Sequence, residues 1–367
     1  MDFDFSDDQK LLADQVQRFL DEQCDTTRVR GVLESTPKFS AEVWQGLVDM
    51  GLTGTAIPES YGGTGAGYLE LCLVAQQLGA HLAPVPFGST VYLLAEALLR
   101  FGNEVQKETW LPKLCAGEVK GAVAWIEGLE RMTEQSVATA WADGQLTGKK
   151  NIVSDGTIAD VYLVLARDGA ELGLYLVGAG VGVSAERVES VDLTRDVAAV
   201  TFEAAPAELL AKDGWTALQH LFDRAAVLYA FEQLGGAQKA LDMAVAYAQE
   251  RFAFGRAIGS FQAIKHMLAD MFVAMKLAES NCYYAAWALA NDAPDLSLAA
   301  ATARVSATQA FQLCAKDNIQ VHGGMGFTWE FDCHLFYRRS NYLALEIGSL
   351  GEWEARLVDA LPLQNIA

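Results

Sequence analysis

The pattern of residue types along the chain changes twice, and this constrains its fold more than any other feature. From Ser6 to about Phe101, and again from Trp215 onward, the pattern is that of amphipathic helices. Between about Gly121 and Leu210 it becomes short β-branched and aliphatic runs bounded by Gly, Asp and Asn, which is typical of antiparallel strands. The order of helices, strands and helices predicts an α+β architecture with separate units.

The segments that carry this prediction can be located. The helical segments are Asp7–Asp21, Tyr68–Leu78, Phe261–Leu289 and Leu296–Ile319, and the strand-like runs are Val161–Leu165, Leu174–Val177 and Ala198–Phe202. A core stripe on one helix face comprises Leu234, Ala237, Leu241, Val245 and Ala248. We therefore predict an N-terminal helical domain over residues 1–120, a middle antiparallel β-domain over 121–212 and a C-terminal helical bundle over 213–367.

Composition excludes several classes of protein. A chain of 367 residues with 51% hydrophobic composition can bury a large core. The net charge of −20 argues against nucleic-acid binding, which needs Lys and Arg to neutralise phosphates. Six scattered cysteines show no metal-ligand spacing, so we expect no metal site. The acidic N-terminus and the lack of an apolar run of ~18 residues predict a cytoplasmic protein that does not enter a membrane.

Three motifs resemble those of one enzyme family. They are Arg251-Phe-Ala-Phe-Gly-Arg-Ala-Ile-Gly-Ser-Phe-Gln262, Gly51-Leu-Thr-Gly-Thr-Ala-Ile-Pro-Glu-Ser-Tyr-Gly-Gly63 and Gln320-Val-His-Gly-Gly-Met-Gly-Phe327. Together they resemble the acyl-CoA dehydrogenase signature and are spread over most of the chain. The resemblance implies the helical, β, helical fold of that family, FAD as cofactor and oxidation of an acyl-CoA thioester. The Gly-rich stretch Gly62–Gly67 is predicted to be a turn, with a phosphate cradle as the alternative.

The residue types in two of these motifs suit a flavin dinucleotide. Arg251 supplies a fixed cation for a pyrophosphate, Phe254 an aromatic wall and Gln262 paired donors and acceptors. Gly323 and Gly324 let the backbone approach a ligand closely. In the family these motifs hold the part of FAD that reaches across a subunit boundary, so the resemblance implies an oligomer. The alternative for Arg251 is a surface charge at a helix end, and the alternative for the two glycines is a simple helix cap. The candidate cofactor-binding residues are Arg251, Phe254, Gln262, Gln320, Gly323, Gly324 and Ser154.

The segments that face the flavin ring in the family are less similar. Ala124–Gly128 stands in place of a Thr-Glu-Pro run, and Glu127 is the residue that corresponds. Asn151–Gly156 stands in place of Trp-Ile-Thr-Asn-Gly, with Ser154 for the Thr and Ile152 for the Trp. A hydroxyl is kept there and the aromatic ring is lost.

The catalytic base is missing from its usual places. Dehydrogenation needs a carboxylate to remove the proton alpha to the thioester while a hydride leaves the beta carbon. Ile347 stands at the Glu position of most relatives, and Ala225 at the position used by others. Glu232, about two helical turns after Ala225, is the candidate base, with a structural carboxylate as the alternative. Glu346 and Asp223 lie one or two residues off the family's positions and are weaker candidates.

Two further segments, Leu335–Gly348 and Val191–Arg195, resemble a branch of actinobacterial-type dehydrogenases that act on bulky CoA esters such as steroid side chains. Several of that branch pair unlike subunits. We therefore predict an FAD-dependent acyl-CoA dehydrogenase that passes electrons to an electron-transfer flavoprotein and forms a homo- or hetero-tetramer. The alternative is a non-catalytic subunit that completes the FAD and acyl site of a homologous partner.

Overall fold

The computed structural model describes residues 5–128 and 130–361. Packing divides the chain into two compact units. The first, here the helical unit, comprises Met1–Val29, Tyr68–Ala83 and Ala226–Ala367. The second, here the mixed unit, comprises Arg30–Gly67 and Pro84–Ala225. The boundaries predicted at residues 120 and 212 follow changes of secondary structure and not packing, so the three-domain division stays a prediction.

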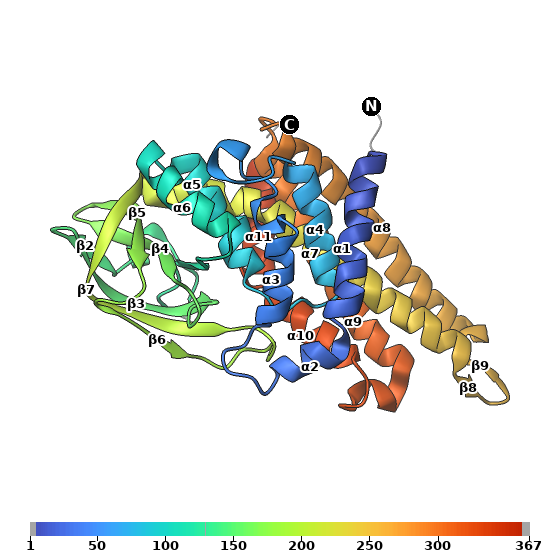
Figure 1. Ribbon diagram of the computed structural model, residues 1–367. Coiled ribbons are helices and arrows are strands. Elements are labelled where there is room, and N and C mark those ends of the chain that lie inside the picture. The colour runs from blue at the N-terminus through green and yellow to red at the C-terminus, as the bar shows by residue number, and fades with distance from the viewer. Residues whose placement is uncertain (1–4, 129, 362–367) are drawn as a thin grey trace, which may run out of the picture. The chain divides into compact units, whose positions relative to one another are not determined.

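The helical unit is built from long helices (Figure 1). Its elements are α1 (Asp7–Gln23), α4 (Tyr68–Ala80), most of α7 (Gly214–Glu250), the hairpin of β8 (Phe252–Ala253) and β9 (Arg256–Ala257), η5 (Ile258–Ser260), α8 (Gln262–Ala290), α9 (Leu296–His322), η6 (Gly323–Phe327), α10 (Cys333–Leu343) and α11 (Leu350–Ala360). The sequence sets the starts of α1 and α11 through capping boxes, Ser6 with Gln9 and Ser349 with Glu352.

Close packing of α4 against α7 depends on two glycines. A Cβ at Gly79 would lie 1.8 Å from the backbone oxygen of Glu232, and a Cβ at Gly235 would lie 1.8 Å from that of Gln76. These separations are far below van der Waals contact, so only glycine lets the two helix backbones approach this closely. The predicted core stripe on α7 is buried except for the half-buried Val245.

The mixed unit combines short helices with a sheet. Its helical elements are α2 (Thr26–Val32), which begins in the helical unit, α3 (Ala41–Asp49), η1 (Leu52–Gly54), η2 (Glu59–Tyr61), the π-helix η3 (Gly88–Ala95), α5 (Glu96–Phe101), α6 (Glu104–Cys115) and η4 (Glu134–Ser136). The strands are β1 (Gly121–Ala124), β2 (Ala140–Ala142), β3 (Gln145–Ser154), β4 (Val161–Asp168), β5 (Glu171–Gly178), β6 (Val183–Arg187) and β7 (Val197–Lys212).

The sheet closes on itself. Its strand order is β1-β4-β2-β3-β7-β5, β5 pairs back with β4, and β6 adds to β7. An apolar core that includes Leu146, Val164 and Phe202 fills the interior. Most pairings are antiparallel as expected, but β1 and β2 both run parallel to β4. A parallel neighbour needs a long crossover, which alternation of apolar residues within a strand does not reveal.

The predicted helical and strand segments are confirmed, and so is the α+β architecture. The helices α8 and α9 begin and end within three residues of the predicted bounds. Within the described part of the chain, no helix combines the length and apolar character that a bilayer crossing requires.

We expect Gly79→Ala to destabilise the helical unit by roughly 1–3 kcal/mol, because the added methyl group forces α4 away from α7. Urea denaturation followed by far-UV circular dichroism measures this change. Gly31→Ala is the matched control, since a Cβ there meets nothing within 4 Å. Equal stability of the two variants would contradict the close crossing.

Candidate functional site

A short hairpin presents the first motif at the end of α7. Arg251 is exposed directly after the helix, and its backbone oxygen accepts a hydrogen bond of 2.8 Å from the Ile258 amide, which closes the hairpin. Phe254 occupies the turn with φ of 54° and is 96% exposed. Figure 1 shows this hairpin projecting beyond the long helices. The one ring contact of Phe254 among the described residues is with the edge of Phe261, whose centroid lies 6.2 Å away, so most of the Phe254 ring faces solvent.

Ring stacking joins the end of α7 to the end of α9. The rings of Tyr247 and His322 are stacked with centroids 4.0 Å apart, and the edge of Phe331 meets both. Burial lowers the pKa of His322, so the ring in this stack is neutral at pH 7. Arg251 lies one helical turn after Tyr247, and Gly323 directly follows His322. The structure thus brings the two predicted dinucleotide motifs to one end of the helical unit.

The groups at this end fit a dinucleotide diphosphate. Gly323 has φ of 61°, a conformation that favours glycine. Gly324 needs no such conformation, and a Cβ there would meet nothing within 4 Å. Packing within the chain therefore does not explain the second glycine, whereas close approach of a ligand would. Gln262 and Gln320 are both exposed, at the start of α8 and near the end of α9.

Ser154 belongs to the mixed unit, whereas the other six candidate cofactor residues belong to the helical unit. It is half-buried at the end of β3, opposite Val197 of β7. Segments 124–128 and 151–156, which the sequence comparison placed at the flavin ring, meet here. Ile126 forms a β-bridge with Ile152, and the Asn151 amide donates to the Ile126 oxygen at 2.8 Å.

The candidate base Glu232 is a buried carboxylate beside a cation. Its side chain is 4% exposed, and Oε1 lies 3.9 Å from Nη1 of Arg339, which is itself buried. Nη2 of Arg339 donates to the Leu82 oxygen at 3.1 Å. Sequence reasoning missed Arg339, because nothing local indicates that a residue so far along the chain meets Glu232. This environment fits the structural alternative for Glu232 as well as the catalytic one.

The positions where relatives carry the base are apolar here. Ile347 is 2% exposed and Ala225 is fully buried. Glu346 is half-buried and accepts a hydrogen bond of 3.2 Å from the Tyr229 hydroxyl. Arg304 stacks on the Tyr229 ring at 5.8 Å; burial lowers its pKa to about 10, and Tyr229, Glu346 and Glu232 oppose that shift. Arg304 therefore stays charged at neutral pH. Asp223, the remaining weak candidate, is 8% exposed.

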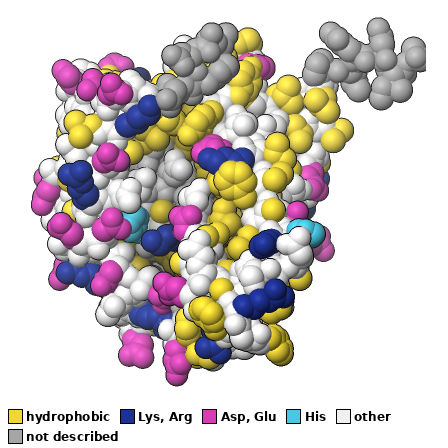
Figure 2. Space-filling view, turned by 90° about the vertical axis from the view of Figure 1, so that its right-hand side faces the viewer, with side chains coloured by type: hydrophobic (Ala, Val, Ile, Leu, Met, Phe, Trp, Pro, Cys, Tyr) yellow, Lys and Arg dark blue, Asp and Glu magenta, His cyan; other side chains and the backbone are white. Residues whose placement is uncertain are grey.

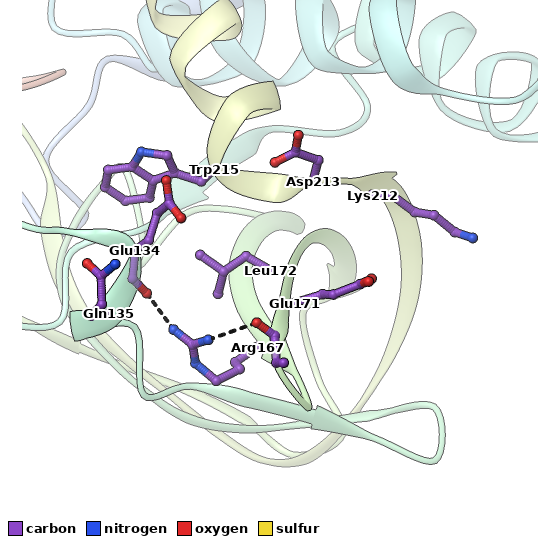
Figure 3. Close-up of a pocket in the computed structure, with 9 residues that line it drawn as sticks. Glu134, Gln135, Arg167, Glu171, Leu172, Lys212, Asp213 and Trp215 are labelled. Carbon is purple, nitrogen blue, oxygen red and sulfur yellow. Dashed lines mark hydrogen bonds between the residues drawn. The ribbon is translucent and has the colours of Figure 1, made fainter.

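A pocket of about 720 Å³ lies in the mixed unit (Figure 3). Its charged lining comprises Glu134, Glu171, Asp213, Arg167 and Lys212, with Trp215 on one wall. The Arg167 guanidinium already donates to the backbone oxygens of Val137, Ala170 and Glu134. The carboxylates therefore outnumber the cations that could meet a ligand, which disfavours a polyanion such as FAD or CoA.

Comparison with known proteins identifies the family. Residues 6–118 match the acyl-CoA dehydrogenase N-terminal domain and residues 212–351 the acyl-CoA dehydrogenase C-terminal domain. The chain is 32% identical to acyl-CoA dehydrogenase IpdE2 of Mycolicibacterium smegmatis over 96% of its own length and 98% of that protein. The chain belongs to the acyl-CoA dehydrogenase family. Members of this family are FAD-dependent oxidoreductases, so the predicted family, enzyme class and cofactor are confirmed at that level.

Two solved structures extend the likeness to the whole fold. The ChsE4–ChsE5 complex from Mycobacterium tuberculosis contains a chain that is 29% identical, with a TM-score of 0.91 and full coverage of both chains. A variant of the steroid acyl-CoA dehydrogenase Tcur3481–Tcur3483 is 29% identical with a TM-score of 0.87, covering 96% of this chain and 97% of that one. Both are assemblies named for two components.

We expect Arg339→Met to destabilise the helical unit by roughly 3–5 kcal/mol, because it removes the guanidinium beside the buried Glu232 carboxylate. The double variant Glu232→Gln/Arg339→Met should recover part of this loss. Urea denaturation of both single variants and the double variant completes the cycle. Strictly additive losses would show that the two side chains do not interact.

Proposed function

We propose that this chain takes part in FAD-dependent α,β-dehydrogenation of an acyl-CoA thioester. The observation that carries the proposal is the convergence of Arg251 with Gly323 and Gly324 through the Tyr247–His322 stack. FAD, when bound, supplies the acceptor for the hydride that leaves the substrate's beta carbon. The chain would supply a guanidinium and two glycines for the diphosphate, and the exposed side-chain amides of Gln262 and Gln320 are further candidate contacts.

The cofactor-binding end suggests that a second subunit shares the site. Phe254 projects from the helical unit, and α8 exposes a row of apolar side chains. The row comprises Phe272, Val273, Leu277, Tyr284 and Trp287. Figure 2 views the side of the molecule at the right of Figure 1 and shows hydrophobic side chains gathered in a band on it. Exposed apolar patches of this kind mark interfaces, so we propose a tetramer with identical or homologous subunits.

The substrate and the electron acceptor follow from the same proposal. The likeness to a steroid acyl-CoA dehydrogenase supports a bulky, steroid-like acyl group. Two electrons leave the substrate in each turnover and must pass to an acceptor. We propose an electron-transfer flavoprotein for this role, as in the family the chain belongs to.

A second function is favoured by one observation, the absence of a carboxylate at both usual base positions. Ile347 and Ala225 are buried and cannot accept a proton. Glu232 is then the chain's own candidate base, and its contact with Arg339 also fits a structural role. The alternative function is a non-catalytic subunit that completes the FAD and acyl site of a homologous partner, which supplies the base.

If Glu232 is the base, Glu232→Gln should lower turnover at least 100-fold while FAD stays bound, because the amide keeps the shape and loses basicity. Turnover is measured with CoA thioesters of different bulk and an artificial electron acceptor. Glu250→Gln, an exposed change on the same helix, is the control. Unchanged turnover in Glu232→Gln removes this residue from the mechanism. Turnover that appears only beside a homologous subunit supports the companion function.

We expect Arg251→Ala to raise the dissociation constant of FAD about 10-fold or more, because it removes a charge-assisted contact to the diphosphate. Flavin fluorescence titration of apoprotein measures the change. Arg18→Ala removes another exposed arginine, from α1, and should leave FAD affinity unchanged. Full flavin retention in Arg251→Ala at low FAD concentration would contradict the assigned site.

A further inference from the structure

Lys150 is a buried cation that the proposed chemistry leaves unused. It lies on β3, and its side chain has no solvent exposure. Its Nζ lies 2.5 Å from Oε1 of Glu127 and donates to the Leu165 oxygen of β4 at 2.6 Å. An ammonium group is buried at such cost only where its partners hold it firmly. The neighbouring Lys149 is exposed, so the burial is specific to position 150.

Glu127 uses both of its carboxylate oxygens inside the protein. Oε2 accepts from the Ala138 amide at 2.6 Å, and Oε1 accepts from the Thr139 amide at 3.0 Å in addition to Lys150. The backbone oxygen of Glu127 accepts a further hydrogen bond from the side-chain amide of Asn151. The carboxylate thus links segment 124–128, strand β3 and the segment that leads into β2. Both of its oxygens therefore face partners inside the protein.

Electrostatics shows that this link is a pair of opposite charges at neutral pH. Burial raises the pKa of Glu127, but Lys150 and the hydrogen bonds from Ala138 and Thr139 outweigh it, so the net shift is downward. Burial lowers the pKa of Lys150 to about 8, against the opposing effect of Glu127. Both groups are therefore ionised at pH 7. Removing one charge leaves the other buried, which makes the pair far more sensitive than a surface salt bridge.

The pair holds together the two segments that correspond to the family's flavin-ring segments. Two further contacts join the same segments. Ile126 forms a β-bridge with Ile152, and the Asn151 amide donates a hydrogen bond of 2.8 Å to the Ile126 oxygen. Ser154, the candidate hydroxyl, follows four residues after Lys150 on the same strand. The contacts of Glu127 and Ile126 together fix segment 124–128 against β3.

We propose that Lys150 is a positioning residue, which holds segment 124–128 against β3 through Glu127 and so sets the backbone edge that meets the flavin ring. The inference rests on the proposed function, since it needs bound FAD. In this arrangement Glu127 acts on the segment's position, because its carboxylate faces the amides of Ala138 and Thr139 inside the protein.

The test compares Lys150→Met, the double variant Glu127→Gln/Lys150→Met and the control Lys149→Met. Each is purified as the full chain, with its homologous partner where flavin retention requires one. Three properties are measured: thermal stability, FAD dissociation constant and the visible absorption and circular dichroism of the bound flavin. Lys150→Met should lose stability because it leaves the Glu127 carboxylate buried, and the double variant should regain it.

The double variant decides between positioning and plain stabilisation. If Lys150 positions the ring edge, the double variant folds stably yet keeps a shifted flavin spectrum and an FAD dissociation constant raised about 10-fold. Wild-type flavin properties in that variant overturn the inference. Loss of folding in both variants also overturns it, because the pair then serves the fold alone. Failure of wild type and Lys149→Met to retain flavin, with or without a partner, overturns the proposed function itself.

Discussion

The stack of Tyr247 on His322 is the contact on which the proposed cofactor site depends. Arg251 and Gly323 are separated by more than seventy residues of sequence, and each stands at the end of its own long helix. A guanidinium can share a diphosphate with a glycine backbone only if the two helix ends are held in register. Two stacked rings flanked by Phe331 provide this register, because aromatic contacts restrict both distance and angle. The side chains of Arg251, Gln262 and Gln320 are exposed at this end, where the proposed dinucleotide would meet them.

The described buried ion pairs share one feature in both units. Each pair joins two segments that are far apart in the sequence. In the mixed unit Glu96 binds Arg224, and Asp155 lies 3.6 Å from Arg195. In the helical unit Glu232 lies beside Arg339. Pairs of this kind contribute little net stability compared with apolar side chains of equal volume, but breaking one is costly. Their value is in fixing one arrangement of segments, which is what a cofactor site requires.

The helices and the strand-rich middle could be predicted because they depend on local periodicity. The Arg251–Gln262 and Gln320–Phe327 motifs could be found because they depend on residue type. Residues 262–290, for example, carry their helical period in the sequence itself. The partners of buried charges are different. Glu232 meets Arg339 and Lys150 meets Glu127 only after the chain has folded, and no local pattern encodes those distances. The same reason hides the parallel pairing of β1 with β4, since strand direction is set by the crossover.

The overall charge of −20 sharpens the question of how a polyanionic ligand binds here. Long-range electrostatic attraction cannot assist the binding of FAD or CoA, because the average field of the protein repels these anions. At physiological salt this field is also screened beyond roughly 8 Å. Binding must then rest on short-range groups: a guanidinium that keeps its charge at any relevant pH, and backbone amides that glycine leaves accessible. Arg251 and the Gly323–Gly324 pair are groups of this type. The proposed subunit interface would add a further element, because excluding water from the site strengthens each of these contacts.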